Sequence, residues 1–249
     1  MNDPLSRHTL EAKYRRSKIL NGVLAAIVVF LGIVVVAQML PGQSPTSSPT
    51  PAASETTGGE QATGGDMDFV RREAGDPKAI GDVDAPVVLT EWVDLRCPFC
   101  ASFSRDTLPT LIEEYVDTGR VRIEFTDVAY FGAQSGDASV AAHAAANQDK
   151  YVDFLTAVFN EAPENGHADL TREVLIDFAA KVDMPDLSKF TADLDDPTVR
   201  ARAEAKTATA QQLGVSAVPF FVAGKTAMSG AQPLDSFREY LDDALAKAE

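Results

Sequence analysis

The two cysteines of the chain, Cys97 and Cys100, are separated only by Pro98 and Phe99, and the sequence contains no other cysteine. Two thiols at this spacing can form a short disulfide and exchange it with the thiols of other molecules. The apolar run Val87–Val93 precedes them and a segment with helical spacing follows, so we expect the pair at a strand-to-helix junction. Thiol-disulfide exchange is therefore the first chemistry that the sequence indicates.

The position of the two thiols on the predicted helix gives them different roles. Cys97 lies in the first turn, where unpaired backbone N–H groups and the helix dipole stabilise an anion. Pro98 suits the first helical position because it lacks the N–H that would be unused there. We therefore expect Cys97 to be the attacking sulfur at the exposed edge of the site, and Cys100, one turn further in, to be the buried resolving thiol.

The elements that must position this pair alternate between strands and helices. The helix that starts at Pro98 extends to near Gly119, and Pro109 inside it predicts a kink. Between residues 137 and 212 the pattern is helical throughout, and a last helix begins at Pro233. Strands are expected at Val87–Val93, Val121–Thr126, Phe220–Ala223 and Thr226–Met228.

Three segments between about residues 79 and 245 carry a resemblance to a known family. They are Ile80-Gly81-Asp82 with Ala85-Pro86-Val87, the segment from Asp94 to Cys100, and the segment from Gly214 to Val222 followed by Ser229-Gly230-Ala231-Gln232-Pro233. In this order they resemble the DsbA-like family of extracytoplasmic thiol-disulfide oxidoreductases. The resemblance implies an α/β thioredoxin-like fold with a helical subdomain inserted at about 137–212.

The resemblance also implies roles for residues outside the cysteine pair. It implies a cis peptide bond between Val218 and Pro219, opposite the cysteines, where the backbone pairs with a bound substrate chain. Together with Pro98 and Phe99, these two residues are expected to contact the substrate. The family further implies that Glu91 is a buried acid that carries the proton of the second thiol, although strand alternation alone leaves open that Glu91 faces the solvent.

An uncharged stretch of 22 residues, 19–40, precedes the predicted domain. It is long enough to cross a bilayer as a helix, and the balance of +3 over residues 1–18 predicts a cytoplasmic N-terminus. We therefore expect a single-pass protein of the cell membrane whose catalytic domain, 67–249, is extracytoplasmic, with a cleaved signal peptide as the alternative. Residues 41–66 are rich in Pro, Ser, Thr and Gly and predict a flexible linker.

Charge and histidine content argue against two other classes of function. The chain carries −15 and its first 18 residues +3, so residues 41–249 carry −18, whereas nucleic-acid binding needs clustered Lys and Arg. His8, His143 and His167 are too scattered to complete a zinc site with the cysteines, so no metal or other cofactor is expected. Asp94 and Arg96, beside the cysteines, are interpreted as a solvated loop pair.

These observations favour an oxidase that introduces disulfides into reduced secreted or cell-envelope proteins. Such an enzyme needs its own disulfide renewed, which predicts a quinone-linked membrane partner, either DsbB-like or a vitamin K epoxide reductase homologue. Two alternatives remain open. One is a reductase or isomerase of the same fold, and the other is a non-catalytic extracytoplasmic binding domain with one short structural disulfide.

Overall fold

The computed structural model describes residues 69–248. The predicted cytoplasmic end 1–18, membrane helix 19–40 and linker 41–66 lie outside these residues. Within the described part of the chain, no helix combines the length and the apolar character needed to cross a membrane.

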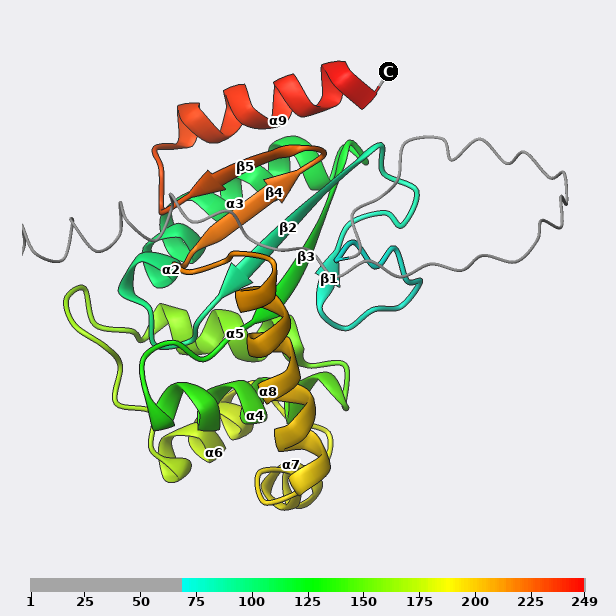
Figure 1. Ribbon diagram of the computed structural model, residues 1–249. Helices are drawn as coiled ribbons and strands as arrows, with labels where there is room; N and C mark the ends of the chain where they lie inside the picture. The colour runs from blue at the N-terminus through cyan, green and yellow to red at the C-terminus, as the bar shows by residue number, and fades with distance from the viewer. Residues whose placement is uncertain (1–68, 249) are drawn as a thin grey trace, which may run out of the picture. The chain divides into compact units, whose positions relative to one another are not determined.

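A five-stranded sheet, in the order β1-β3-β2-β4-β5, forms the centre of the domain (Figure 1). Its strands are β1 (Ala79–Ile80), β2 (Val87–Val93), β3 (Val121–Asp127), β4 (Phe220–Ala223) and β5 (Thr226–Ser229). Strand β2 pairs parallel with β3 and antiparallel with β4, and all of its residues are buried. This central position explains its mostly apolar sequence. The four predicted strands are confirmed, whereas β1 is too short to give a sequence signal.

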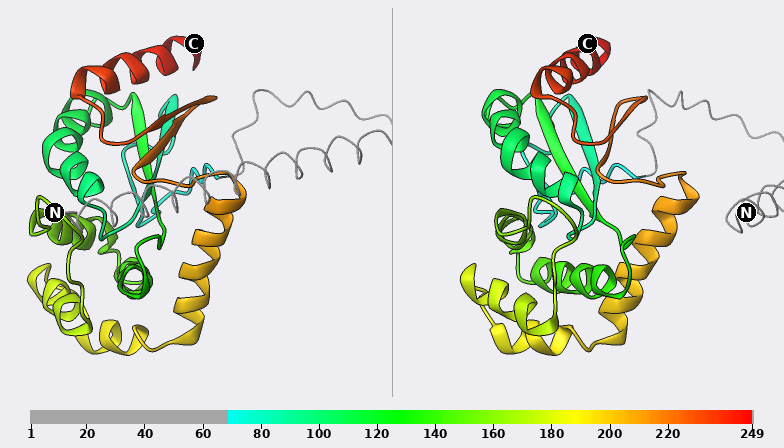
Figure 2. Two further views of the ribbon diagram at one scale, coloured as in Figure 1. Left: turned by 60° about the vertical axis from the view of Figure 1, so that its left-hand side comes forward. Right: turned by 90° about the vertical axis from the view of Figure 1, so that its left-hand side faces the viewer.

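Most of the helices lie between β3 and β4 in the chain. Helices α4 to α7 gather beyond the end of the sheet toward which β2 points, and α8 leads back to β4 (Figures 1 and 2). The predicted helical insertion is therefore confirmed, and it begins at Ala133. The helices are α2 (Pro98–Ser102), α3 (Leu108–Leu111), α4 (Ala133–Ala146), α5 (Tyr151–Asn160), α6 (Arg172–Lys181), α7 (Leu187–Asp193), α8 (Pro197–Gln212) and α9 (Leu234–Ala248).

The helix that follows the cysteines is irregular on both sides of Pro109. Two π-helical turns, η1 (Phe103–Thr107) and η2 (Ile112–Val116), alternate with the short α-helices α2 and α3. The N–H of Leu108 bonds to the carbonyl of Phe103, five residues earlier. Because proline has no N–H and its ring crowds the preceding turn, a regular α-helical ladder cannot continue through Pro109. The distortion expected at this proline thus takes the form of wider turns.

An aromatic cluster fixes this helix against the sheet. The ring of Phe103 lies 4.7 Å from that of Phe221 on β4 and 4.9 Å from that of Phe237 on α9, measured between centroids. On β2, Trp92 is only 2% exposed and makes an edge contact with Phe220, which confirms it as a core residue. These contacts hold the start of α2 at the end of β2, where the cysteines lie.

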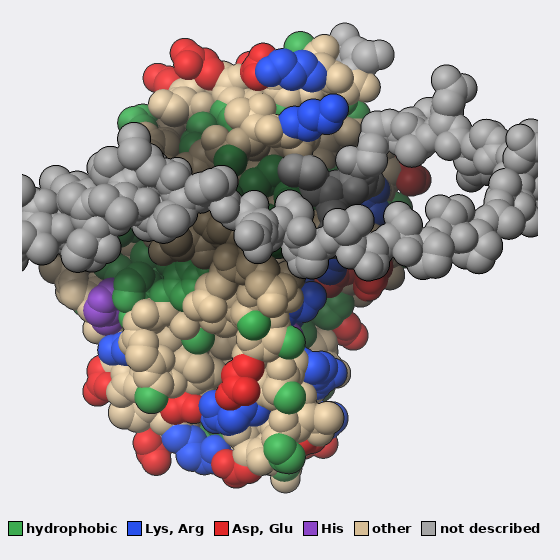
Figure 3. Space-filling model, viewed as in Figure 1, with side chains coloured by type: hydrophobic (Ala, Val, Ile, Leu, Met, Phe, Trp, Pro, Cys, Tyr) green, Lys and Arg blue, Asp and Glu red, His purple; other side chains and the backbone are tan. Residues whose placement is uncertain are grey.

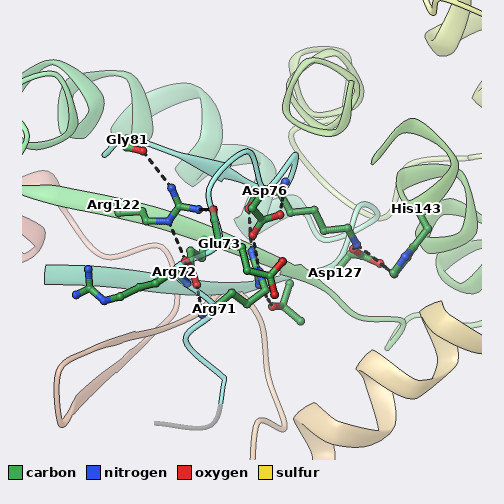
Figure 4. A network of polar contacts seen from close by, with 11 residues as sticks. Arg71, Arg72, Glu73, Asp76, Gly81, Arg122, Asp127 and His143 are labelled. Carbon is green, nitrogen blue, oxygen red and sulfur yellow. Dashed lines mark hydrogen bonds and ion pairs between the residues drawn. The ribbon is translucent and has the colours of Figure 1, made fainter. Parts of the chain in front are cut away.

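A buried ion-pair network joins the segment before β1 to β3 and α4 (Figure 4). The Lys78 Nζ lies 2.6 Å from Oδ1 of the fully buried Asp127 and 3.1 Å from Nε2 of His143. The Ser139 hydroxyl donates a further hydrogen bond to Asp127. Burial alone would raise the pKa of Asp127, but the neighbouring Lys78 and His143 hold it well below its usual range. His143 is therefore a packed residue of this network.

Candidate active site

Cys97 is the N-cap of α2, so its sulfur lies where the free N–H groups of the first turn converge. Its Sγ accepts a hydrogen bond from the Cys100 backbone N–H at 3.4 Å. Pro98 occupies the first helical position, as predicted. Cys100 is fully buried, and both cysteines are free thiols, so the site is in its reduced form.

Cys97 is far less accessible than its helix position predicts. It is only 2% exposed, so the expectation of an exposed edge is wrong for this residue. The reason is a distant segment that packs over it: the Cys97 thiol donates a hydrogen bond to the Val218 carbonyl at 3.5 Å. The peptide bond between Val218 and Pro219 is cis, as the family resemblance implied. Pro98 is half-buried, and Phe99 is 64% exposed and borders the site on its outer side.

The two thiols differ in ionisation. A hydrogen bond from the Cys100 thiol, helped by the N–H groups of Cys100 and Phe99, lowers the pKa of Cys97 despite its burial. Burial raises the pKa of Cys100 well above its ordinary value, and the adjacent Cys97 raises it further. Of the two thiols, Cys97 is therefore the one that ionises more readily, and Cys100 is the one that keeps its proton more firmly. This polarity supports the predicted roles of attacking and resolving sulfur.

Glu91 lies in the interior, on β2, with only 2% of its surface exposed. Burial raises the pKa of its carboxyl well above the usual range, and the charge on Cys97 raises it further. The Glu91 charge in turn raises the pKa of Cys100. The solvent-facing alternative for Glu91 is therefore wrong, and the carboxyl lies near enough to Cys100 for its charge to influence the ionisation of that thiol. Its role as proton carrier remains a prediction.

Replacing Glu91 with glutamine should stabilise the reduced protein near neutral pH while slowing the ionisation of Cys100. The pKa of the Glu91 carboxyl is higher in the folded than in the unfolded state. Above about pH 4.3, the free energy of unfolding of the wild type therefore falls by up to about 1.4 kcal/mol per pH unit, until the pH reaches the folded pKa. The variant lacks this titration. Its free energy of unfolding should therefore equal that of the wild type near pH 4 and exceed it by a growing amount toward pH 8. Chemical denaturation between pH 4 and pH 8 measures the free energies of unfolding of both proteins. If they differed by the same amount at pH 4 and at pH 8, Glu91 would not titrate as described.

Asp94 and Arg96 are not the solvated loop pair that local sequence suggests. The carboxylate of Asp94 is fully buried and accepts hydrogen bonds from the Arg96 N–H at 2.8 Å, the Tyr130 N–H at 2.7 Å and the Ser135 hydroxyl at 2.9 Å. The loop after β3 and the start of α4 therefore fold over the active-site turn and exclude water from it. Burial raises the pKa of Asp94, although these hydrogen bonds oppose the shift, and its charge raises the pKa of Cys97.

Sequence reasoning missed two aromatic residues that the fold brings to this turn. His167 lies in the loop between α5 and α6, and its Nδ1 is 3.0 Å from the Arg96 carbonyl. Its ring stacks on Phe131, from the loop after β3, with 4.3 Å between centroids. No local signal links either residue to the cysteines, because both lie in loops far along the chain. On the face shown in Figure 3, hydrophobic side chains gather near α2.

Within residues 69–248, no group of three or more His, Cys, Asp or Glu side chains is arranged to hold a metal ion. The site described here consists only of protein thiols, the Glu91 carboxyl and the residues that surround them. The chemistry that such a cysteine pair supports is the transfer of electrons between sulfur pairs.

Comparisons with known proteins agree with this geometry. A family model described as thioredoxin matches residues 73–243. The probable disulfide bond formation protein D of Bacillus cereus is 29% identical over 176 residues, which cover 68% of this chain and 79% of that protein. Two solved structures share 25% identity and cover 69% of this chain. They are oxidised BdbD from Bacillus subtilis, with a TM-score of 0.64 over 94% of that chain, and alpha-DsbA1 from Wolbachia pipientis, with a TM-score of 0.60 over 92% of that chain.

The matched region contains the sheet, both cysteines, the cis-proline segment and the helical insertion. The Bacillus cereus relative is a probable disulfide bond formation protein by name. With its polarised cysteine pair, the chain belongs to the thioredoxin family and is a DsbA-like thiol-disulfide oxidoreductase.

Proposed function

We propose that the enzyme is an oxidase that introduces disulfides into reduced secreted or cell-envelope proteins. The observation that carries this proposal is the contrast between the two thiols, with the pKa of Cys97 lowered and that of Cys100 raised. A stabilised Cys97 thiolate favours the reduced pair, and this makes the corresponding disulfide a stronger oxidant. The similarity to disulfide bond formation proteins supports the same direction.

In the proposed reaction, a substrate thiolate attacks Sγ of Cys97 in the Cys97–Cys100 disulfide. The disulfide breaks, a mixed disulfide forms between substrate and Cys97, and Cys100 leaves as a thiolate that takes a proton from Glu91. A second substrate thiolate then attacks the substrate sulfur of the mixed disulfide, which forms the substrate disulfide and releases the Cys97 thiolate. Two electrons thus pass from the substrate to the enzyme. Both protons of the substrate thiols enter the solvent, and one proton returns from the solvent to Glu91 to replace the proton given to Cys100.

The surroundings of Cys97 suit a polypeptide substrate. Val218 and Pro219 lie next to the attacking sulfur, and Phe99 offers an exposed apolar ring beside it. In this proposal the backbone before Pro219 pairs with an extended substrate segment, while Pro98 and Phe99 contact its side chains.

We place the catalytic domain outside the cytoplasm, anchored to the cell membrane by residues 19–40. The apolar stretch and its positive flank support this location. Each cycle leaves Cys97 and Cys100 reduced by two electrons, and the chain has no other cysteine. A separate oxidant is therefore required to renew the disulfide. We assign this role to a quinone-linked membrane protein, DsbB-like or a vitamin K epoxide reductase homologue. Deleting that partner should leave Cys97 and Cys100 reduced in cells, and an unchanged oxidised pair would remove it from the scheme.

The reduction potential of the cysteine pair tests the direction of the reaction. An oxidase should equilibrate with glutathione buffers at a potential between about −180 and −120 mV, above the value of about −270 mV that is typical of a thioredoxin reductant. The redox state can be followed by thiol alkylation and mass shift of the soluble domain. A potential below about −250 mV would overturn the oxidase proposal.

A reductase or isomerase is the second candidate, and one observation favours it. The pKa of Cys97 is lowered overall, but the buried carboxyl of Asp94 opposes this lowering and so reduces the preference for the reduced pair. The same measurement of potential separates this candidate from the oxidase.

A further inference from the structure

Arg96, directly before Cys97, joins the active-site turn to two loops of the helical part. Its Nε donates a hydrogen bond to the Ala168 carbonyl at 2.8 Å, and its Nη1 donates to the Phe131 carbonyl at 2.6 Å. Neither residue is part of a strand or helix, so the positions of these loops depend on such side-chain contacts. A planar guanidinium can hold two carbonyl groups in a fixed relation.

The same turn also fixes the ring of His167. The Arg96 carbonyl can only accept a hydrogen bond, so the Nδ1 of His167, 3.0 Å away, must be the donor. The imidazole is stacked on Phe131 with an interplanar angle of 28°. Since Phe131 is half-buried and His167 is exposed, one face of the imidazole covers Phe131 and the other is open to solvent.

This stack lies against the active-site turn. The carbonyl that holds His167 belongs to Arg96, whose next residue in the chain is Cys97. This turn is held by the buried Asp94, which accepts the Arg96 N–H. A flat aromatic surface that is held at a fixed place on the active-site turn is suited to stack with a side chain of a polypeptide bound there.

We propose that the stacked rings of Phe131 and His167 form a subsite for an aromatic side chain, next to the reacting cysteine of a polypeptide substrate. Arg96 is the positioning residue that holds these rings in place. Arg96 itself touches neither sulfur nor substrate and acts through the two loops. The inference rests on the proposed function only in that the substrate is a polypeptide. It does not depend on whether the enzyme oxidises or reduces that substrate.

The test compares two synthetic peptides that differ only in the residue beside their cysteine, phenylalanine in one and glycine in the other. Stacking of an aromatic pair should give the wild type about a twofold to tenfold higher kcat/KM for the phenylalanine peptide. Arg96→Lys keeps the charge but loses the planar fork, so this preference should disappear. Its reaction with dithiothreitol, which is too small to reach the stack, should stay within about twofold of the wild type.

Arg105 provides a matched control, because its Nη1 also donates to two backbone carbonyls, of Phe159 at 2.6 Å and Ala162 at 3.1 Å. These carbonyls lie near the start of the loop that contains His167, away from the active-site turn. Arg105→Lys should keep the phenylalanine preference. An equal loss in both variants would mean that general loosening of the loop is responsible, and this would overturn the proposal.

His167 gives a second test that does not disturb the Arg96 contacts to the two loops. His167→Ala should abolish the preference, whereas His167→Phe should retain it because the stacked surface remains. No preference in the wild type, or a preference that survives in Arg96→Lys or His167→Ala, would disprove the subsite. The oxidase assignment is tested by the reduction potential instead. The subsite and the oxidase assignment can therefore be rejected separately.

Discussion

Replacing Cys100 with alanine should convert the enzyme into a trap that stays covalently attached to its substrates. In this variant Cys97 keeps its N-cap position. The hydrogen bond from the Cys100 thiol is lost, but the backbone N–H groups of residues 99 and 100 still lower the pKa of Cys97, so it can exchange with substrate disulfides. Without Cys100, no thiol of the chain can resolve the mixed disulfide that results. Adducts should accumulate and should be visible on non-reducing gels and by mass spectrometry.

Cys97→Ala is the matched control, because the remaining Cys100 is fully buried and its pKa is raised. This variant should form almost no adducts and should lose turnover by about 10³-fold or more. Abundant adducts on Cys100 would contradict the assigned polarity. If cells that carry a variant without both cysteines behaved normally, the enzyme assignment would be wrong, and a non-catalytic binding domain would remain.

The second large effect concerns stability and lies in the network behind β3. Replacing Lys78 with methionine should lower the free energy of unfolding at pH 7 by about 3–5 kcal/mol, because it leaves the buried carboxylate of Asp127 without its principal cation. The pKa of Asp127 is depressed in the folded state, so the stabilisation is present above the ordinary carboxyl pKa of about 3.9 and is lost as the pH falls below it. The difference between variant and wild type should therefore shrink in acid.

Denaturant titrations at pH 7 and at acidic pH measure this effect. Lys150→Met is a suitable control, because the pair of Lys150 with Asp153 is exposed and its loss should change stability very little. The double variant Lys78→Met/Asp127→Asn should recover part of the loss, since the uncompensated charge is then absent. A double variant less stable than Lys78→Met would contradict this account.

Sequence alone predicted the parts of the fold that depend on local pattern. The apolar run of β2 indicated a buried strand, and the proline after Cys97 indicated the start of a helix. The cis bond before Pro219 came from the family resemblance. In each case the decisive signal lies within a few residues of the feature, or within a motif whose order along the chain is characteristic.

The rest depends on contacts between distant segments. The burial of Cys97 is caused by Val218, which is 121 residues away along the chain. The burial of Asp94 requires the loop after β3 to fold back over the turn, and the placement of His167 requires the helical insertion to return to it. Hydrophobic periodicity carries no information about which loop covers which turn, so these features could not be predicted from one sequence.

The near-complete burial of Cys97 has a consequence for the lifetime of the enzyme in oxidising surroundings. A thiolate is the form of cysteine that peroxides convert to sulfenic acid and then, irreversibly, to sulfinic acid. With 2% of Cys97 exposed, reagents from solvent reach its sulfur rarely, whereas Cys100 is only one helical turn away. A sulfenic acid formed on Cys97 would be attacked by Cys100, which releases water and restores the disulfide. The burial of Cys97 and the nearby Cys100 thiol thus also limit irreversible oxidation of Cys97.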